Sequence, residues 1–334
     1  MKKSLLILLF TCWALFFAAF RPVMPFAAET AAFPDGTPVT GGRILMGTIG
    51  EPSNLIPYMA SDSASGEITG LLYVAPLKYD KDLNVVPWAA ASYEVLEGGR
   101  LLRFVLRDDI RWEDGVPLTA DDVEFTYKLM IDPKTPTAYS GDFLAIESFK
   151  KTGRLSFEVR YAKPFARSLM TWMGAILPKH VLEGQDIMTT PVARKPIGAG
   201  PYRLAKWDAG SMLTLTASDT YFEGRPNLDE VVYRIIPDPS TMFLELKAGK
   251  LDMMSLSPQQ YLRQTQGPQW ERDWRKYRYL SFSYTFLGFN LEHPFFKDVR
   301  VRRAISMAID RQSLIDGVLL GQGVPTVGPY KPGT

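Results

Sequence analysis

The sequence predicts a mixed α/β protein, because strand-like and helix-like hydrophobic patterns alternate along the chain without an internal repeat. Residues 154–161 (RLSFEVRY) carry apolar side chains at every second position, which is the pattern of a half-buried strand. Residues 101–107 (LLRFVLR) show the same alternation. Residues 299–309 (VRVRRAISMAI) instead gather their apolar side chains along one stripe at helical spacing. Asp310 can then cap a second helix, which Gly321 would end.

The composition predicts a globular protein with more than one domain. A chain of 334 residues with 46% hydrophobic residues is long enough to bury a large core. Its 38 lysines and arginines nearly balance its 36 aspartates and glutamates, and the basic residues form no long run. We therefore expect no nucleic acid among its partners.

Residues 1–28 predict a secretory signal peptide. Lys2 and Lys3 precede an uncharged apolar stretch at residues 4–20, and an Ala27-Ala28 pair offers a cleavage site. The alternative is an uncleaved anchor, because the apolar stretch approaches the shortest length that spans a membrane. The single cysteine of the chain lies inside this segment. A cleaved protein would therefore have no disulfide and no thiolate metal site.

Residues 112–130 (WEDGVPLTADDVEFTYKLM) predict a tight turn followed by a capped helix. Gly115 can take a positive φ in the turn, and Thr119 and Asp122 have the spacing of a capping box. Asp132-Pro133 would end the helix. The four acids in and after the turn could alternatively collect a cation, but they lack the alternating ligands of a calcium loop. They are Glu113, Asp114, Asp121 and Asp122. We expect a scaffold here and no metal site.

Other patterns that could indicate an enzyme are weak. The two histidines, His180 and His293, lie in turn-like segments and are predicted to be isolated surface residues. Gly198 and Gly200 precede a strand-like run, so they predict a tight crossover between lobes and not a phosphate loop. No G-x-S-x-G motif occurs. We expect neither enzyme activity nor a cofactor, although a secreted hydrolase with unidentified carboxylates remains an alternative.

Three ordered blocks carry a family resemblance. They are residues 102–136, which include RWEDGVPLTADDVEFTYKLMIDPKTP, residues 196–254, which begin PIGAGPYRLAKWD, and residues 289–323, which include DVRVRRAISMAIDRQSL. The chain resembles the family 5 extracellular solute-binding proteins, the peptide and oligopeptide receptors of ABC importers. Residues 51–73 (EPSNLIPYMASDSASGEITGLLY) are similar to the first motif of the family, with Ile56 where an aspartate is usual. The resemblance runs from about Gly42 to the last residue.

The resemblance implies a two-lobed, clamp-like α/β fold of the type II periplasmic-binding-protein class, in its dipeptide and oligopeptide-binding branch. The first lobe would comprise residues 40–75 plus 196–285, with residues 76–195 as an inserted second domain. Residues 286–334 would be the start of a third domain, the second lobe, which is truncated at the C-terminus. We therefore expect residues 29–334 alone to bind ligand weakly or not at all.

The implied function is that of a monomeric periplasmic receptor, which captures di- or oligopeptides and delivers them to the permease of an ABC transporter in the inner membrane. The same family also takes up nickel complexes, sugars, opines and antibiotics, so the ligand class stays open. A membrane-anchored sensor or chaperone domain of the same fold is a further alternative.

The family pattern carries five ligand-binding residues over to this chain. Ser61, Asp62 and Ser63 would lie at the edge of the cleft, in the loop that follows Pro57. Tyr139 would face the ligand, and Tyr284 would lie on a strand that crosses between the lobes. Each has a structural alternative: a solvated loop for the first three, packing at a helix end for Tyr139, and a core position for Tyr284.

Overall fold

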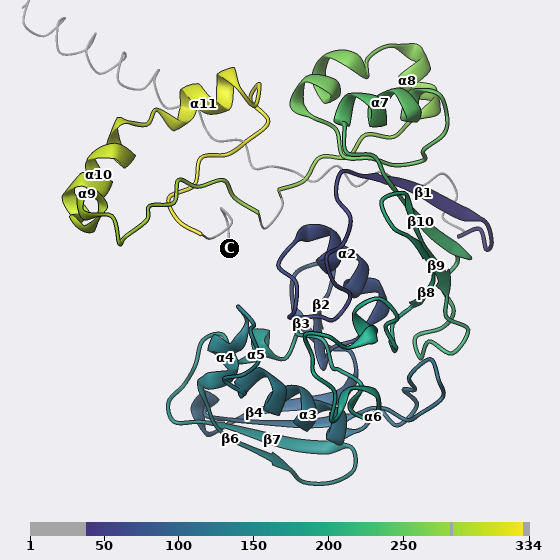
Figure 1. Cartoon of the computed structure of the whole chain (residues 1–334), viewed down its shortest axis with the longest axis vertical. Helices are drawn as coiled ribbons and strands as arrows, with labels where there is room; N and C mark the ends of the chain where they lie inside the picture. Colours follow the sequence, from purple (N-terminus) through teal and green to yellow (C-terminus); the bar gives the residue numbers. More distant parts are fainter. Residues whose placement is uncertain (1–37, 281–282, 330–334) are drawn as a thin grey trace, which may run out of the picture. The chain divides into compact units, whose positions relative to one another are not determined.

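The computed structural model describes residues 38–280 and 283–329. These residues fall into two compact units, residues 38–255 and residues 256–329, and each unit is described by itself (Figure 1). The predicted signal peptide at residues 1–28 lies outside the described residues. Within the described ranges, no helix is both long enough and apolar enough to cross a bilayer.

The first unit contains a four-stranded sheet built from two distant parts of the sequence. Its strands, in spatial order, are β1 (Arg43–Thr48), β10 (Glu230–Ile235), β9 (Met212–Ala217) and β8 (Tyr202–Asp208). β1 pairs parallel with β10, and the other neighbours are antiparallel. Helix α2 (Ser63–Leu72) packs against β8, so it lies next to this sheet (Figure 1).

A second sheet comes entirely from the middle of the chain. Its strands, in spatial order, are β4 (Ala90–Leu96), β5 (Leu101–Leu106), β7 (Ser156–Tyr161) and β6 (Ile146–Lys151). A separate two-stranded sheet joins β2 (Leu77–Tyr79) to β3 (Val85–Pro87). The two strands predicted from alternation are confirmed as β5 and β7. The rings of Phe104 and Phe157 on these strands are fully buried and stack with centroids 4.8 Å apart.

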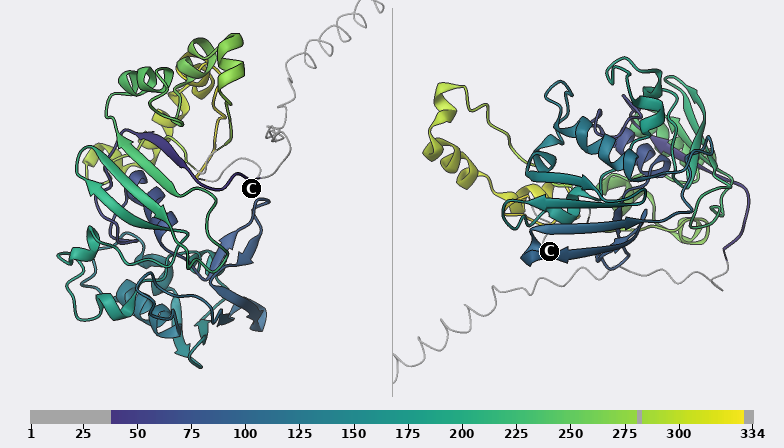
Figure 2. Two further views of the ribbon diagram at one scale, coloured as in Figure 1. Left: turned by 90° about the vertical axis from the view of Figure 1, so that its right-hand side faces the viewer. Right: turned by 90° about the horizontal axis from the view of Figure 1, so that it is seen from below.

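Short helices cover one face of the second sheet (Figures 1 and 2). They are α3 (Ala120–Ile131), α4 (Ser140–Leu144) and α5 (Ser168–Thr171); the first unit also contains α6 (Lys179–Leu182), α7 (Pro239–Lys247), η1 (Glu97–Gly99) and η2 (Pro191–Ala193). The predicted start of α3 is confirmed, because the Thr119 amide donates to the Asp122 carboxylate at 2.9 Å and the Thr119 hydroxyl accepts in return. Trp112 is fully buried, and Gly115 has a φ of 91°. Trp112, Gly115 and Thr119 therefore have structural roles in this segment, as predicted.

The glycines of residues 196–204 allow two backbone segments to touch. The Gly200 amide donates to the Leu72 carbonyl at the end of α2, at 2.9 Å. A Cβ atom on Gly198 would lie 2.0 Å from the same oxygen, and a Cβ atom on Gly200 would lie 2.4 Å from the Leu71 carbonyl oxygen. The Glu113 amide donates to the Gly198 carbonyl at 2.8 Å, and the Gly198 amide donates to the Glu113 side chain at 3.1 Å. Neither glycine can therefore be replaced without moving the backbone.

The second unit is helical where it has regular structure. Its elements are η3 (Gln260–Gln264), α8 (Pro268–Asp273), α9 (Pro294–Lys297), α10 (Val299–Ala308) and α11 (Arg311–Gly317). Asp310 caps α11 as predicted, accepting from the Ser313 amide at 3.0 Å. The prediction that Tyr284 lies on a strand is wrong, because residues 283–290 have no regular structure. A strand needs a paired partner, and no ladder in the described residues includes this segment.

We expect Gly198→Ala to lower the free energy of unfolding by about 1–3 kcal/mol, because its Cβ atom would collide with the Leu72 carbonyl. Gly70→Ala is the matched control. Gly70 lies exposed inside α2, and a Cβ atom added there would have no neighbouring atom within 4 Å, so this change should raise the free energy of unfolding by about 0.5–1 kcal/mol. Urea unfolding of both variants checks the signs, and equal effects would contradict the close approach.

Candidate functional site

The loop that precedes α2, residues 53–62, forms one side of the candidate site. The Ser53 hydroxyl donates to the Asp62 carboxylate at 2.5 Å and so joins the two ends of the loop. The Ser65 hydroxyl, in the first turn of α2, donates to the same carboxylate at 2.8 Å and accepts from the Ser53 amide at 3.0 Å. Leu55 is fully buried and anchors the loop in the core. The loop is therefore closed at its ends and held by an apolar contact.

Asp62 is the N-cap of α2. Its carboxylate also accepts from the Ser65 amide at 2.7 Å, in addition to the two hydroxyls. Burial raises the pKa of Asp62, but the hydrogen bonds from Ser53 and Ser65 outweigh it, so the pKa lies below its usual value. The group is charged at neutral pH and favours the positive end of the helix. Ser61 and Ser63 flank it and are exposed.

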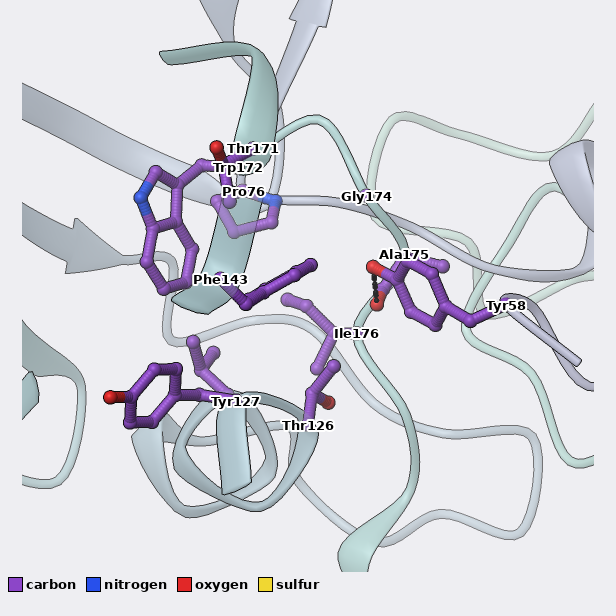
Figure 3. Close-up of a pocket in the computed structure, with 11 residues that line it drawn as sticks. Tyr58, Pro76, Thr126, Tyr127, Phe143, Thr171, Trp172, Gly174, Ala175 and Ile176 are labelled. Atoms are coloured by element: carbon purple, nitrogen blue, oxygen red, sulfur yellow. Dashed lines mark hydrogen bonds between the residues drawn. The ribbon is translucent and has the colours of Figure 1, made fainter. Parts of the chain in front are cut away.

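Tyr58, in the middle of this loop, has an unusual backbone conformation. Its φ is 73°, in the left-handed region that residues other than glycine seldom adopt. Its hydroxyl donates to the Ala175 carbonyl at 2.8 Å, as Figure 3 shows. Burial raises the pKa of Tyr58 far above its usual value, so the hydroxyl stays protonated and remains a donor.

The segment before α4 meets the loop from the other side. The Thr137 hydroxyl donates to the Tyr58 carbonyl at 2.8 Å, and the Tyr139 hydroxyl donates to the Ala60 carbonyl at 3.4 Å. The rings of Tyr58 and Tyr139 meet edge to face with centroids 6.0 Å apart. Tyr139 nevertheless stays 46% exposed, so its ring borders the loop and faces solvent.

A small cavity lies under Tyr58, with room for about one water molecule. Its lining is almost wholly apolar, and Figure 3 shows the rings of Phe143, Tyr127 and Trp172 around it. Gly174 lies directly beside Tyr58: a Cβ atom on this glycine would be 2.2 Å from the Tyr58 hydroxyl oxygen. The cavity is too small to hold a peptide or any other ligand larger than water, so it is a packing feature and not the binding site.

The structure brings four of the five predicted site residues together. Ser61, Asp62 and Ser63 follow directly on Ala60, whose carbonyl the Tyr139 hydroxyl contacts. Tyr284 belongs to the other unit, where its ring lies 5.5 Å from the Phe286 ring and is 45% exposed. The alternative of a core position for Tyr284 is wrong at this exposure.

The residue that sequence reasoning missed is Tyr58. Nothing in the sequence marks a tyrosine for a positive φ, since glycine is the residue that normally signals that conformation. The only local indication is its place after Pro57 in the motif that carries the family resemblance.

The four acids considered as a cation site are engaged with other groups. The Asp114 carboxylate lies 2.7 Å from Nε2 of His180, and Asp121 pairs with Lys151. Glu113 accepts from the Gly198 amide, and Asp122 accepts from the Thr119 amide. His180 is thus at the surface as predicted, but it has a partner. In the part of the chain that the structure describes, no cluster of three or more His, Cys, Asp or Glu residues could hold a metal ion.

Comparison with known proteins identifies the family. Residues 84–334 match the bacterial extracellular solute-binding proteins, family 5 Middle. The chain belongs to this family. It is 32% identical over 303 residues to the oligopeptide-binding protein AppA of Bacillus subtilis, in an alignment that covers 89% of this chain and 55% of AppA.

Solved structures show the same fold. The structure of B. subtilis AppA in complex with a nonapeptide is 31% identical, has a TM-score of 0.80, and is matched over 89% of this chain and 59% of that chain. The structure of NikZ from Campylobacter jejuni in complex with Ni(L-His) is 26% identical, with a TM-score of 0.73, and is matched over 84% and 55%. The predicted fold class, a type II periplasmic-binding-protein fold, is confirmed. The chain spans little more than half the length of these relatives.

We expect Asp62→Ala to lower the free energy of unfolding by about 1 kcal/mol at pH 7, because the cap of α2 is lost. The folded-state pKa of Asp62 is depressed, so its contribution is present above the unfolded pKa of about 3.9 and is lost as pH falls through the folded pKa. The difference from the wild type should therefore shrink in acid. Urea unfolding at pH 7 and at about pH 3 measures it.

The matched control is Asp62→Asn, because asparagine caps a helix nearly as well as aspartate and carries no titrating group. This variant keeps an oxygen for the Ser65 amide but loses the charge and the acceptor of the two serine hydroxyls, so at pH 7 it should lose part of the stability that Asp62→Ala loses. A cost for Asp62→Ala that is the same at both pH values would contradict the role of the charged carboxylate.

Proposed function

We propose that this chain is the ligand-capturing part of an exported receptor, which binds di- or oligopeptides and delivers them to the permease of an ABC transporter. The observation that carries the proposal is the 31% identity and TM-score of 0.80 to a peptide-bound AppA, over 89% of this chain. The local geometry supports it. Exposed hydroxyls and an exposed aromatic ring lie beside one loop, and this combination suits an extended ligand held through its backbone.

The proposed ligand-binding residues have different tasks. Ser61 and Ser63 supply exposed hydroxyl groups, and Tyr139 supplies a ring surface. Asp62 contributes as the cap that fixes the start of α2. Tyr284, exposed in the second unit, is proposed as a further contact. We propose no metal and no cofactor in this binding.

The proposed domain division follows the two sheets. Residues 40–75 plus 196–285 form the first lobe, residues 76–195 form the inserted domain, and the next lobe begins at residue 286. In support, the first sheet draws its strands from residues 43–48 and 202–235, and the second sheet draws its strands from residues 90–161. We also propose that the protein works as a monomer.

Nickel uptake is the second candidate, because the NikZ structure with Ni(L-His) is also similar at 26% identity. Against it, His180 is engaged with Asp114 and its side chain is only 28% exposed. A hydrolase or a membrane-anchored sensor of this fold would be the remaining alternatives. Binding and turnover measured in one experiment separate these classes.

We expect the protein purified from the cell envelope to retain peptides when it is incubated with a mixture of short and longer peptides. Tyr139→Ala should weaken this binding about tenfold, since a lost aromatic contact is worth about 1 kcal/mol or more. Native mass spectrometry measures the complexes, with Ni(L-His) as a competing ligand and the peptide masses as a check for cleavage.

Tyr79→Ala is the matched control, because Tyr79 is similarly exposed, at 41%, but lies on β2. It should leave binding unchanged. Retention of Ni(L-His) in place of peptide, or cleavage of the peptides, would contradict the proposed function.

We propose that the protein is exported and released into the periplasm after cleavage near Ala28. Osmotic shock of the native cells should release it without the segment up to about Ala28, as N-terminal sequencing would show. Retention in the membrane pellet with an intact N-terminus would instead support the anchored sensor or chaperone.

A further inference from the structure

We propose that Tyr58 is a positioning residue, which holds the loop at residues 59–63 against the inserted domain and so sets its spacing from Tyr139 before a ligand arrives. The proposal rests on the proposed function, because it assigns a task to a residue that supports the same site. The Tyr58 hydroxyl is enclosed by its neighbours, and the residue is not proposed to touch the ligand.

The backbone of Tyr58 is the first support. A tyrosine in the left-handed region costs on the order of 1 kcal/mol, and such a conformation persists only when the surrounding contacts compensate for it. The ring supplies part of the compensation. It meets Phe143 edge to face at 6.0 Å and 90°, and Tyr139 at 6.0 Å and 65°. Conformations of this kind concentrate at functional sites.

Two hydrogen bonds hold Tyr58 from opposite ends of the residue. Its side-chain hydroxyl donates to the Ala175 carbonyl, in the segment after α5, at 2.8 Å. Its backbone carbonyl accepts from the Thr137 hydroxyl, in the segment before α4, also at 2.8 Å. The two partners come from separate stretches of residues 76–195. Neither the ring nor the backbone of Tyr58 can therefore move without breaking a contact to this region.

The fit around the hydroxyl is tight. At Gly174, a Cβ atom would be 2.2 Å from the Tyr58 oxygen and 3.1 Å from its Cζ atom. A side chain here would displace the ring. The absence of a side chain at Gly174 leaves room for the Tyr58 ring. A tyrosine at position 58 therefore requires a glycine at position 174.

We call the two hydrogen bonds of Tyr58, to Ala175 and from Thr137, the tether. Further contacts hold the rest of the loop on either side of it. The Leu55 amide donates to the Ala193 carbonyl at 3.0 Å, and the Tyr139 hydroxyl reaches Ala60 at 3.4 Å. The loop then enters α2, which packs against β8 of the other sheet. Residues 61–63 therefore lie between Ala60, which contacts Tyr139, and α2, which packs against β8 of the first sheet. A tether at Tyr58 limits the arrangements of these residues, and fewer arrangements mean a smaller entropy loss on binding.

Amide hydrogen exchange of the protein expressed from its own gene tests the tether without any ligand. Tyr58→Phe keeps the ring and removes the bond to Ala175, and Thr137→Val removes the bond to the Tyr58 carbonyl. Each should accelerate exchange of residues 59–63 about tenfold, the change expected for one lost hydrogen bond. Tyr139 is followed only in Tyr58→Phe, because the Thr137 hydroxyl also accepts from the Tyr139 amide at 3.2 Å. Thr137→Val alters a half-buried surface position and carries the test alone if Tyr58→Phe does not fold.

The controls separate positioning from loss of stability. Tyr93→Phe and Thr265→Val remove matched hydroxyls that bond to the carbonyls of Val85 and Gln260; Tyr93 is on β4, and Thr265 belongs to the second unit. They should leave exchange of residues 59–63 unchanged. The buried Leu177 amide, bonded to the Thr126 hydroxyl at 2.9 Å, should keep its rate in every variant.

A rescue experiment tests the fit. Gly174→Ala should also loosen residues 59–63, and adding Tyr58→Phe should restore part of their protection, because the atom nearest to the new methyl group is removed. Additive effects of the two changes would overturn the assigned contact.

Peptide binding completes the test. In a wild type that binds peptides, Tyr58→Phe and Thr137→Val should weaken the affinity about tenfold, in proportion to the faster exchange. Unchanged exchange of residues 59–63, equal acceleration of Leu177, or faster exchange with undiminished affinity would each overturn the proposal. A wild type that binds no peptide would overturn the proposed function, and the exchange data would still decide whether Tyr58 holds the loop.

Discussion

The arrangement of the first unit depends on the close approach between residues 198–200 and the last turn of α2. The Gly200 amide bonds to the Leu72 carbonyl, and neither Gly198 nor Gly200 leaves space for a side chain. This contact lies where the chain returns from the second sheet to the first. Glu113 joins the same point through two hydrogen bonds to Gly198, and burial raises the pKa of its carboxyl group. Backbone contact at one place therefore ties α2, the turn before α3 and the start of β8.

The candidate site lies at the opposite end of α2. Because the C-terminal end of this helix is fixed by the glycines, its N-terminal end is held in a defined place next to residues 137–139. Asp62 completes the helix there by capping it, and Tyr58 bonds the preceding loop to Ala175 and Thr137. The helix thus joins a fixed backbone contact at its C-terminal end to the loop that carries the exposed hydroxyls of Ser61 and Ser63.

Local sequence signals predicted the elements whose causes are themselves local. The capping box at Thr119, the cap at Asp310 and the alternating strand at residues 156–161 all formed where side chains and backbone a few residues apart dictate the structure. The strand around Tyr284 was expected from the family pattern and not from a local signal. It is absent because a strand forms only where a partner strand lies alongside, and no ladder in the described residues includes this segment. The association of Tyr139 with residues 60–63 came from the family pattern, because nothing local links segments so far apart in the chain.

The fold class, the family, the capped helices and the tight crossover at Gly198 and Gly200 could be predicted from the amino-acid sequence, since these follow from residue types, their spacing and the backbone they allow. The contacts of Asp62 and Tyr58 became visible only in the folded protein. Asp62 caps α2, and its carboxylate accepts hydrogen bonds from the Ser53 and Ser65 hydroxyls. Tyr58 has a backbone conformation that tyrosine disfavours. Both depend on partners brought together by folding, and for Tyr58 these are Thr137, Gly174 and Ala175. The energy of those distant contacts outweighs the local backbone preference of tyrosine. No pattern along the chain could therefore have predicted the positive φ of Tyr58.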